Sequence, residues 1–180
     1  VDILGTGDDA AINLTSGTAT ITGLSVNIST LTSGFGINVE LDGNATINET
    51  KFTINESNVV NIFGKDSVIN VNAGSEITFT DDDGVFNGSL TNNGIVTVNA
   101  VAKIVLGDTA NASNNGTFVN NGNVENKGAI VNNGELRNNS IINNTGSLSN
   151  YGQIINGTVG KIEGNGSFTG NEATKRIGID

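Results

Sequence analysis

Residues 116–157 read, in groups of six, GTFVNN, GNVENK, GAIVNN, GELRNN, SIINNT, GSLSNY and GQIING. The first residue of each group is Gly, except for Ser140. The third residue is always apolar and the fifth is always Asn, which defines a repeat over seven groups. The apolar residues are Phe118, Val124, Ile130, Leu136, Ile142, Leu148 and Ile154, and the Asn residues are Asn120, Asn126, Asn132, Asn138, Asn144, Asn150 and Asn156.

A period of six does not fit an α-helix, in which every sixth residue drifts away from any one face. It does fit a short strand followed by a corner. The apolar third residue then faces inward, and Gly and Asn tolerate the positive φ that a corner can require. Three such units make a coil of about 18 residues, and successive coils stack about 4.8 Å apart, so that identical residues form ladders. The repeat therefore predicts an all-β, right-handed parallel β-helix (β-solenoid) with about 18–22 residues per coil.

The residues before this repeat have the same character in a looser form. Alternating, β-branched runs recur between Gly, Asn and Asp breaks, at residues 18–21, 37–41, 51–54, 59–63, 68–71, 76–79 and 95–98. One further group, GSLTNN at residues 88–93, is out of phase with the main repeat, so we expect a change of coil length or a bulge to separate them. The spacing also suits an antiparallel sandwich. We expect a single solenoid domain over residues 1–180, with irregular coils at 1–115, hexapeptide repeats at 116–157, and a terminal coil and tail at 158–180.

The composition narrows the range of functions. The chain has 180 residues, a net charge of −10, and no Cys, His, Met, Trp or Pro. Without Cys it forms no disulfide and no thiolate site. Its negative charge opposes binding to nucleic acid, and no apolar run is long enough for insertion into a membrane. The chain begins at Val1 rather than Met, so we expect an extracellular protein from which a leader was removed, or a fragment.

The Asn-Asn-Gly hexads of residues 116–157 resemble the β-helical repeats of surface adhesins and adhesin-like proteins of bacteria and archaea. The resemblance implies an exported, elongated protein with a structural or adhesive role. This chain is short for such an adhesin. The hexapeptide helices of acyltransferases share the period, but they use a catalytic His, which this chain lacks.

One acidic cluster offers a candidate site. Asp81, Asp82 and Asp83 are consecutive, and carboxylate oxygens are suitable ligands for calcium. Paired carboxylates also catalyse glycoside hydrolysis. A solvated acidic turn is the interpretation that we favour, with calcium as the alternative. We expect no catalytic residue and no other cofactor, because the chain offers no His and few basic residues to accompany the carboxylates.

Asn-x-Ser/Thr sites are about twice as frequent as chance would give for this composition. They are either a by-product of the repeat or acceptors for N-glycans on outward corners. The twelve sites open at Asn13, Asn27, Asn44, Asn48, Asn55, Asn87, Asn111, Asn115, Asn138, Asn143, Asn156 and Asn165.

Solenoid ends expose unpaired backbone, and natural solenoids usually cover them with a cap. We find no amphipathic helical pattern near either end of the sequence. We therefore expect a subunit of a self-assembling extracellular filament or surface layer, whose partner is a second copy joined by end stacking or strand exchange. The alternatives are a shaft fragment of a cell-surface adhesin, with surface glycans as partners, and a β-helix enzyme that acts on polysaccharides.

Overall fold

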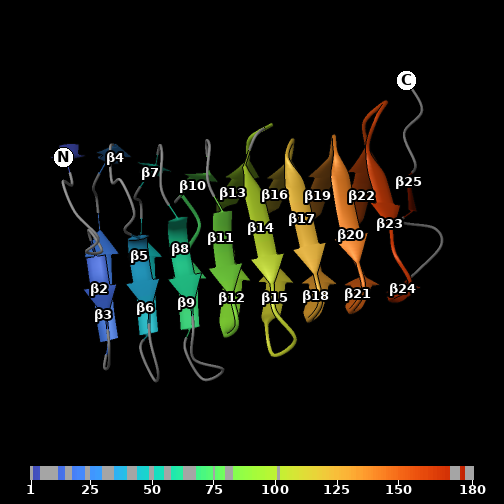
Figure 1. Ribbon diagram of the computed structural model, residues 1–180, viewed down its shortest axis with the longest axis horizontal. Coiled ribbons are helices and arrows are strands. Elements are labelled where there is room, and N and C mark those ends of the chain that lie inside the picture. Colours follow the sequence, from blue (N-terminus) through green and yellow to red (C-terminus); the bar gives the residue numbers. More distant parts are fainter. Residues whose placement is uncertain are drawn as a thin grey trace.

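A computed structural model describes the backbone of residues 2–4, 12–14, 18–22, 25–29, 35–39, 44–48, 51–54, 58–62, 68–74, 76–79, 83–100, 102–170 and 175–176. Side chains are described for residues 69–74, 77–78, 86–100 and 102–170. These residues form twenty-five β-strands and no helix. Figure 1 shows the strands stacked along one axis from the N-terminal to the C-terminal end. The predicted β-solenoid is confirmed.

The strands form three parallel sheets, because each strand pairs with the strand three places later in the chain. Sheet A contains β1 (Asp2–Leu4), β4 (Ser25–Ser29), β7 (Lys51–Ile54), β10 (Glu76–Phe79), β13 (Ile95–Val98), β16 (Thr117–Asn120), β19 (Glu135–Asn138), β22 (Gln153–Asn156) and β25 (Lys175–Arg176). Sheet B contains β2 (Ile12–Leu14), β5 (Phe35–Val39), β8 (Asn58–Ile62), β11 (Asp83–Phe86), β14 (Lys103–Leu106), β17 (Asn123–Asn126), β20 (Ile141–Asn144) and β23 (Lys161–Glu163). Sheet C contains β3 (Thr18–Thr22), β6 (Asn44–Asn48), β9 (Val68–Val71), β12 (Ser89–Asn92), β15 (Asn111–Asn114), β18 (Ala129–Asn132), β21 (Ser147–Asn150) and β24 (Ser167–Gly170).

The coil is right-handed, as expected. In Figure 1 the near strands β14, β17 and β20 run down the page while the chain advances from left to right. This is the hand that crossover connections between parallel strands of one sheet normally take.

The coils are shortest in the hexapeptide repeat, where Thr117 pairs with Glu135, 18 positions later. The predicted range of 18–22 residues fails for the first coils. Asp2 pairs with Asn27, 25 positions later, and Ser25 pairs with Lys51, 26 positions later. The strands there are three to five residues long, so the additional residues lie between strands.

Two turns explain why the group at residues 88–93 is out of phase. Ser89 pairs with Asn111, 22 positions later, which is four more than in the regular coils. The coil between them contains the turns 99–102 and 107–110, closed by Ala102 N donating to Asn99 O at 3.0 Å and Ala110 N donating to Gly107 O at 2.9 Å. The predicted change of coil length is therefore confirmed.

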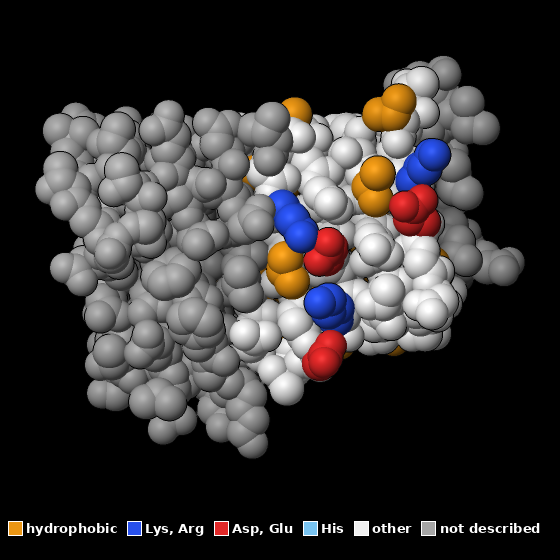
Figure 2. All heavy atoms as spheres, in the orientation of Figure 1, with side chains coloured by type: hydrophobic (Ala, Val, Ile, Leu, Met, Phe, Trp, Pro, Cys, Tyr) orange, Lys and Arg blue, Asp and Glu red, His pale blue; other side chains and the backbone are white. Residues whose placement is uncertain are grey.

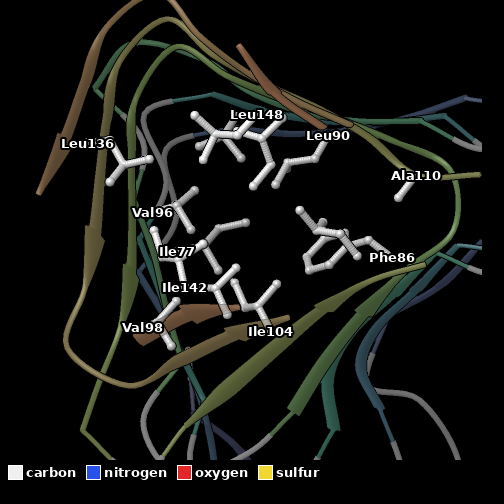
Figure 3. Close-up of a cluster of buried hydrophobic side chains, with 14 of the residues drawn as sticks. Ile77, Phe86, Leu90, Val96, Val98, Ile104, Ala110, Leu136, Ile142 and Leu148 are labelled. Carbon is white, nitrogen blue, oxygen red and sulfur yellow. The ribbon is translucent and has the colours of Figure 1, made fainter. Parts of the chain in front are cut away.

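Aliphatic ladders fill the interior. Of the seven apolar residues of the hexad repeat, all but Phe118 are buried, and Phe118 is partly buried against them. Figure 3 shows side chains from all three sheets meeting in the centre, among them Val96 of sheet A, Ile104 of sheet B and Leu148 of sheet C. Burial of each such side chain stabilises the fold by about 1.5–3 kcal/mol. The predicted inward register is confirmed.

The repeat glycines serve close approach rather than unusual backbone angles, which corrects the expectation from sequence. In the described residues, positive φ occurs at Gly74, Gly164 and Gly170, none of which opens a hexad. A Cβ on Gly134 would instead lie 2.2 Å from the Gly116 carbonyl oxygen of the coil below. Gly at the first register therefore lets successive corners stack in contact.

Candidate functional surfaces

Buried Asn residues form three ladders, one at each corner of the coil. The longest runs through Asn92, Asn114, Asn132 and Asn150, whose consecutive amides are joined by Nδ2–Oδ1 hydrogen bonds of 2.8, 2.7 and 2.8 Å. The other ladders join Asn120 to Asn138 to Asn156, and Asn126 to Asn144. Because buried amides need partners, this arrangement explains how a narrow core accommodates an Asn at each corner of the coil.

Two of the buried amides, those of Asn92 and Asn120, also close their own corners. Asn120 Nδ2 donates to Ile141 O at 3.0 Å, and its Oδ1 accepts the N–H of Gly122 at 3.1 Å. The second contact is an Asx turn, in which the side chain replaces a backbone acceptor. At these corners only two residues lie between consecutive strands.

The bottom of one ladder is incomplete. Asn126 pairs in register with Leu106, so no amide lies below it, and its buried Oδ1 has no hydrogen-bond partner in the structure. An unpaired buried acceptor is destabilising. The ladder therefore begins at Asn126 at a local energetic cost.

A second set of Asn ladders lies on the outside. Asn133 Nδ2 donates to Asn115 Oδ1, and Asn115 Nδ2 donates to Asn93 Oδ1, both at 2.9 Å. These exposed amides donate toward the N-terminal coil, whereas the buried amides donate toward the C-terminal coil. The fourth place in this ladder is taken by Tyr151, which is 65% exposed and is the single Tyr of the chain.

The acidic cluster falls mostly outside the described residues. Asp83 begins β11, whereas Asp81 and Asp82 lie outside the described ranges. Among the described residues, no group of three potential metal ligands comes together. Calcium binding at this cluster stays a prediction.

The Asn-x-Ser/Thr sites occupy different environments. Asn111, Asn115, Asn143 and Asn165 are exposed, and Asn87 and Asn156 are partly buried. Asn13, Asn27, Asn44 and Asn48 lie in strands whose side chains are not described, and Asn55 lies outside the described residues.

Asn138 differs from the other Asn-x-Ser/Thr sites whose side chains are described, because it is fully buried. Its Nδ2 donates to Asn156 Oδ1 at 3.0 Å and to Lys161 O at 3.1 Å. An N-glycan on this nitrogen would require Asn138 to leave its ladder.

The outer faces of sheets A and B carry charged side chains. On sheet B, Lys103 Nζ lies 2.9 Å from Glu125 Oε1, and on sheet A, Arg137 pairs with Glu135. Figure 2 shows cationic and anionic side chains next to one another on the face formed by β14, β17 and β20. Lys161 and Glu163 continue this pattern on β23.

The outer face of sheet C carries no charged side chain within the described residues. Its outward side chains alternate with buried ones and are mostly small hydroxyl or amide groups. They are Asn70, Ser89, Thr91, Asn111, Ser113, Ala129, Val131, Ser147, Ser149, Ser167 and Thr169. The same register positions in β6 and β3 hold Asn44, Thr46, Thr18 and Thr20.

A ridge and a groove lie along the margin of this face. The turn 107–110 adds residues to one corner, and beside it lies an open groove of about 530 Å³. The turn supplies Asp108, Thr109 and Ala110 as one wall, and the groove extends over Ala129 to Ser147, with Asn111, Lys127 and Gly128 also lining it. The sequence indicated the change in coil length but gave no sign of the groove, because the groove depends on which residues stack in neighbouring coils.

No family model, curated protein or solved structure matches this chain. The resemblance to β-helical adhesins therefore stays a prediction. Among the described residues, no helix is long and apolar enough to cross a membrane.

Proposed function

We propose that this protein is a structural rod of an extracellular filament or surface layer, in which copies join at the ends of the solenoid. The observation that supports the proposal most is the open edge of the last described coil. β25, β23 and β24 are the final strands of sheets A, B and C, so within the described residues each has one edge without a neighbouring strand. Unpaired edges attract further strands, and parallel end-to-end contacts that do not close produce open filaments.

The side chains of the last coil support the same contact. Ile162 stacks on Ile142, and Phe168 stacks on Leu148, but both final residues are only partly buried. A further coil above them would complete their burial. A second copy can supply that coil through its own first strands, since all strands run parallel and the joint would continue the same direction.

The extracellular location belongs to the same proposal. It is supported by the resemblance of the hexads to exported surface proteins and by exposed Asn-x-Ser/Thr sites such as Asn111 and Asn143. Intact-mass measurement of the protein purified from its source, before and after glycosidase treatment, tests whether these sites are modified.

The end joint is tested by placing a charge on the last apolar rung. We expect Ile162→Glu to abolish filaments in negative-stain electron microscopy and to leave particles of monomer mass, because an unpaired carboxylate would face the joint. The matched control is Glu163→Gln, the outward neighbour on the same strand, which should assemble like the wild type. Circular dichroism should show unchanged β structure in both variants.

Two outcomes would contradict the end joint. Filaments of normal length from Ile162→Glu would show that the C-terminal coil is not the contact. Monodisperse wild-type rods at all concentrations would instead favour the shaft of an adhesin, and binding to surface glycans would then be the property to measure.

A further inference from the structure

The distribution of charge limits how two rods can approach side by side. Each copy carries a net charge of −10, so copies repel one another at long range. Sheets A and B would bring Glu125, Glu135 or Glu163 to a lateral contact. In the described residues, sheet C offers a face without charged groups, built from side chains no larger than Asn or Val. Lateral contact through sheet C therefore has the lowest electrostatic cost.

The shape of this face is complementary to itself. Asn111, Ala129 and Ser147 are paired in register on β15, β18 and β21. The ridge of residues 107–110 precedes β15, on one side of β18, whereas the groove extends past Ala129 to Ser147 on the other side. A two-fold axis that lies along β18 exchanges these two sides. Each ridge then meets the groove of the other copy, as an isologous interface requires.

We propose that the outer face of sheet C is a lateral self-association surface, in which a second copy binds with a two-fold axis along β18. This inference rests on the proposed structural role, although not on the end joint. The axis brings Ala129 and Val131 against the same residues of the partner, and these are the aliphatic outward side chains of the described face. An apolar centre with a polar rim is the usual anatomy of a protein interface.

The charges at the margin fit the same arrangement. Asp108 and Lys127 are both exposed and both line the groove. Under the two-fold operation, Asp108 on the ridge of one copy is carried to the groove beside Lys127 of the other. Opposite charges therefore meet at the rim of the interface, where they fix register more than affinity.

The size of the face predicts a weak contact that gains strength by repetition. An axis along β18 overlaps the five strands from β12 to β24. Five strands about 4.8 Å apart and about four residues long give roughly 300 Å² per copy. Stable complexes bury about 800 Å² per partner, so one pair alone should dissociate readily. Copies already joined in a filament present many such faces at once, and their effective concentration makes lateral pairing strong.

A cysteine pair tests the axis directly, because the chain contains no other Cys. Val131→Cys should form a disulfide-linked dimer under mild oxidation, since the two-fold axis brings the two thiols together. The matched control is Val119→Cys, the third residue of β16, which is also an outward, half-buried Val between an apolar residue and Asn. It should stay monomeric in non-reducing electrophoresis. Equal cross-linking of both variants, or of neither, would overturn the proposal.

Exchanging the charges of Asp108 and Lys127 provides a second test of how the two copies are placed relative to each other. Asp108→Lys should reduce lateral association in sedimentation equilibrium at least several-fold, and the double variant Asp108→Lys with Lys127→Asp should recover it. Failure of the double variant to recover association, with wild-type secondary structure, would overturn the two-fold placement.

The end joint and the lateral contact through sheet C can be tested independently of each other. In Ile162→Glu, loss of filaments with persistence of the Val131→Cys dimer would support the lateral face independently of the end joint. A rod that stays monomeric but loses retention on immobilised neutral polysaccharide when Ala129 is changed to Arg would overturn self-association and make sheet C a glycan-binding face.

Discussion

Asn132 and Asn133 are neighbours in the chain, but they belong to ladders of opposite kinds. Asn132 is fully buried, accepts from Asn114 Nδ2 at 2.7 Å and donates to Asn150 Oδ1 at 2.8 Å and to Gln153 O at 3.0 Å. Asn133 is exposed and makes a ladder bond that water can replace. The same residue type thus contributes very differently to stability at adjacent positions.

We expect Asn132→Ala to lower the free energy of unfolding by about 3 kcal/mol, because it removes one of the two acceptors of Asn114 Nδ2 and the amide donor to Asn150 Oδ1 and Gln153 O. Asn133→Ala should lower it by less than about 1 kcal/mol, since its bond is solvent-exposed. Urea denaturation followed by circular dichroism measures both values. Equal losses would show that the buried ladder has no special role.

At the scale of a single strand, β15 carries the smallest residue of the aliphatic ladder among the sheet C strands whose side chains are described. Ala112 lies between Leu90 and Ile130 in the sheet C ladder. A cavity of about 30 Å³ adjoins it and is lined mainly by aliphatic side chains, among them Leu106 and Ile142. The ladder is therefore underfilled at this one rung.

Ala112→Val should fill part of this cavity and raise the free energy of unfolding by about 1 kcal/mol. The control is Ala102→Val, because Ala102 is also buried but does not line the cavity. It should instead destabilise by about 1–3 kcal/mol through overpacking. Denaturant-induced unfolding measures the free energy of unfolding of both variants. A loss of stability in Ala112→Val would show that the strand cannot accommodate the larger side chain.

The individual strands also show where the sequence pattern was enough to predict the structure. In residues 116–157 every strand was predictable, because each coil has the same length and each register holds one residue type. Before that repeat, β4, β6, β11, β14 and β15 were not among the predicted runs. In β15 the inward positions are Ala112 and Asn114 rather than large aliphatic residues. β5 begins at Phe35, two residues before the predicted run, because Gly36 within the strand was read as a break.

The candidate surface was less predictable than the fold. Ser89, Asn111 and Ala129 share one column of sheet C, but their spacings are 22 and 18 residues. Only the registers of successive strands place them together. The uncharged face therefore cannot be recognised from the sequence until the length of every coil is known.

At the scale of the whole molecule, charge should govern assembly. Raising the ionic strength from about 10 mM to about 150 mM shortens the screening length from about 30 Å to about 8 Å. We expect this change to raise the weight-average mass in sedimentation experiments, because each copy carries −10 charges and screening reduces the repulsion. Dissociation by salt would show that opposite charges, such as those of Asp108 and Lys127, dominate the contacts.

The uniform 18-residue coil has a consequence for how such a rod can change during evolution. Deleting residues 133–150 would join Asn132 directly to Tyr151, with the outer corner position still filled and every later strand still in its sheet. Duplicating the same segment would lengthen the rod by one spacing of about 4.8 Å. Unequal recombination within the repeat can thus adjust length in whole steps, while both ends and the flat face of the molecule keep their structure.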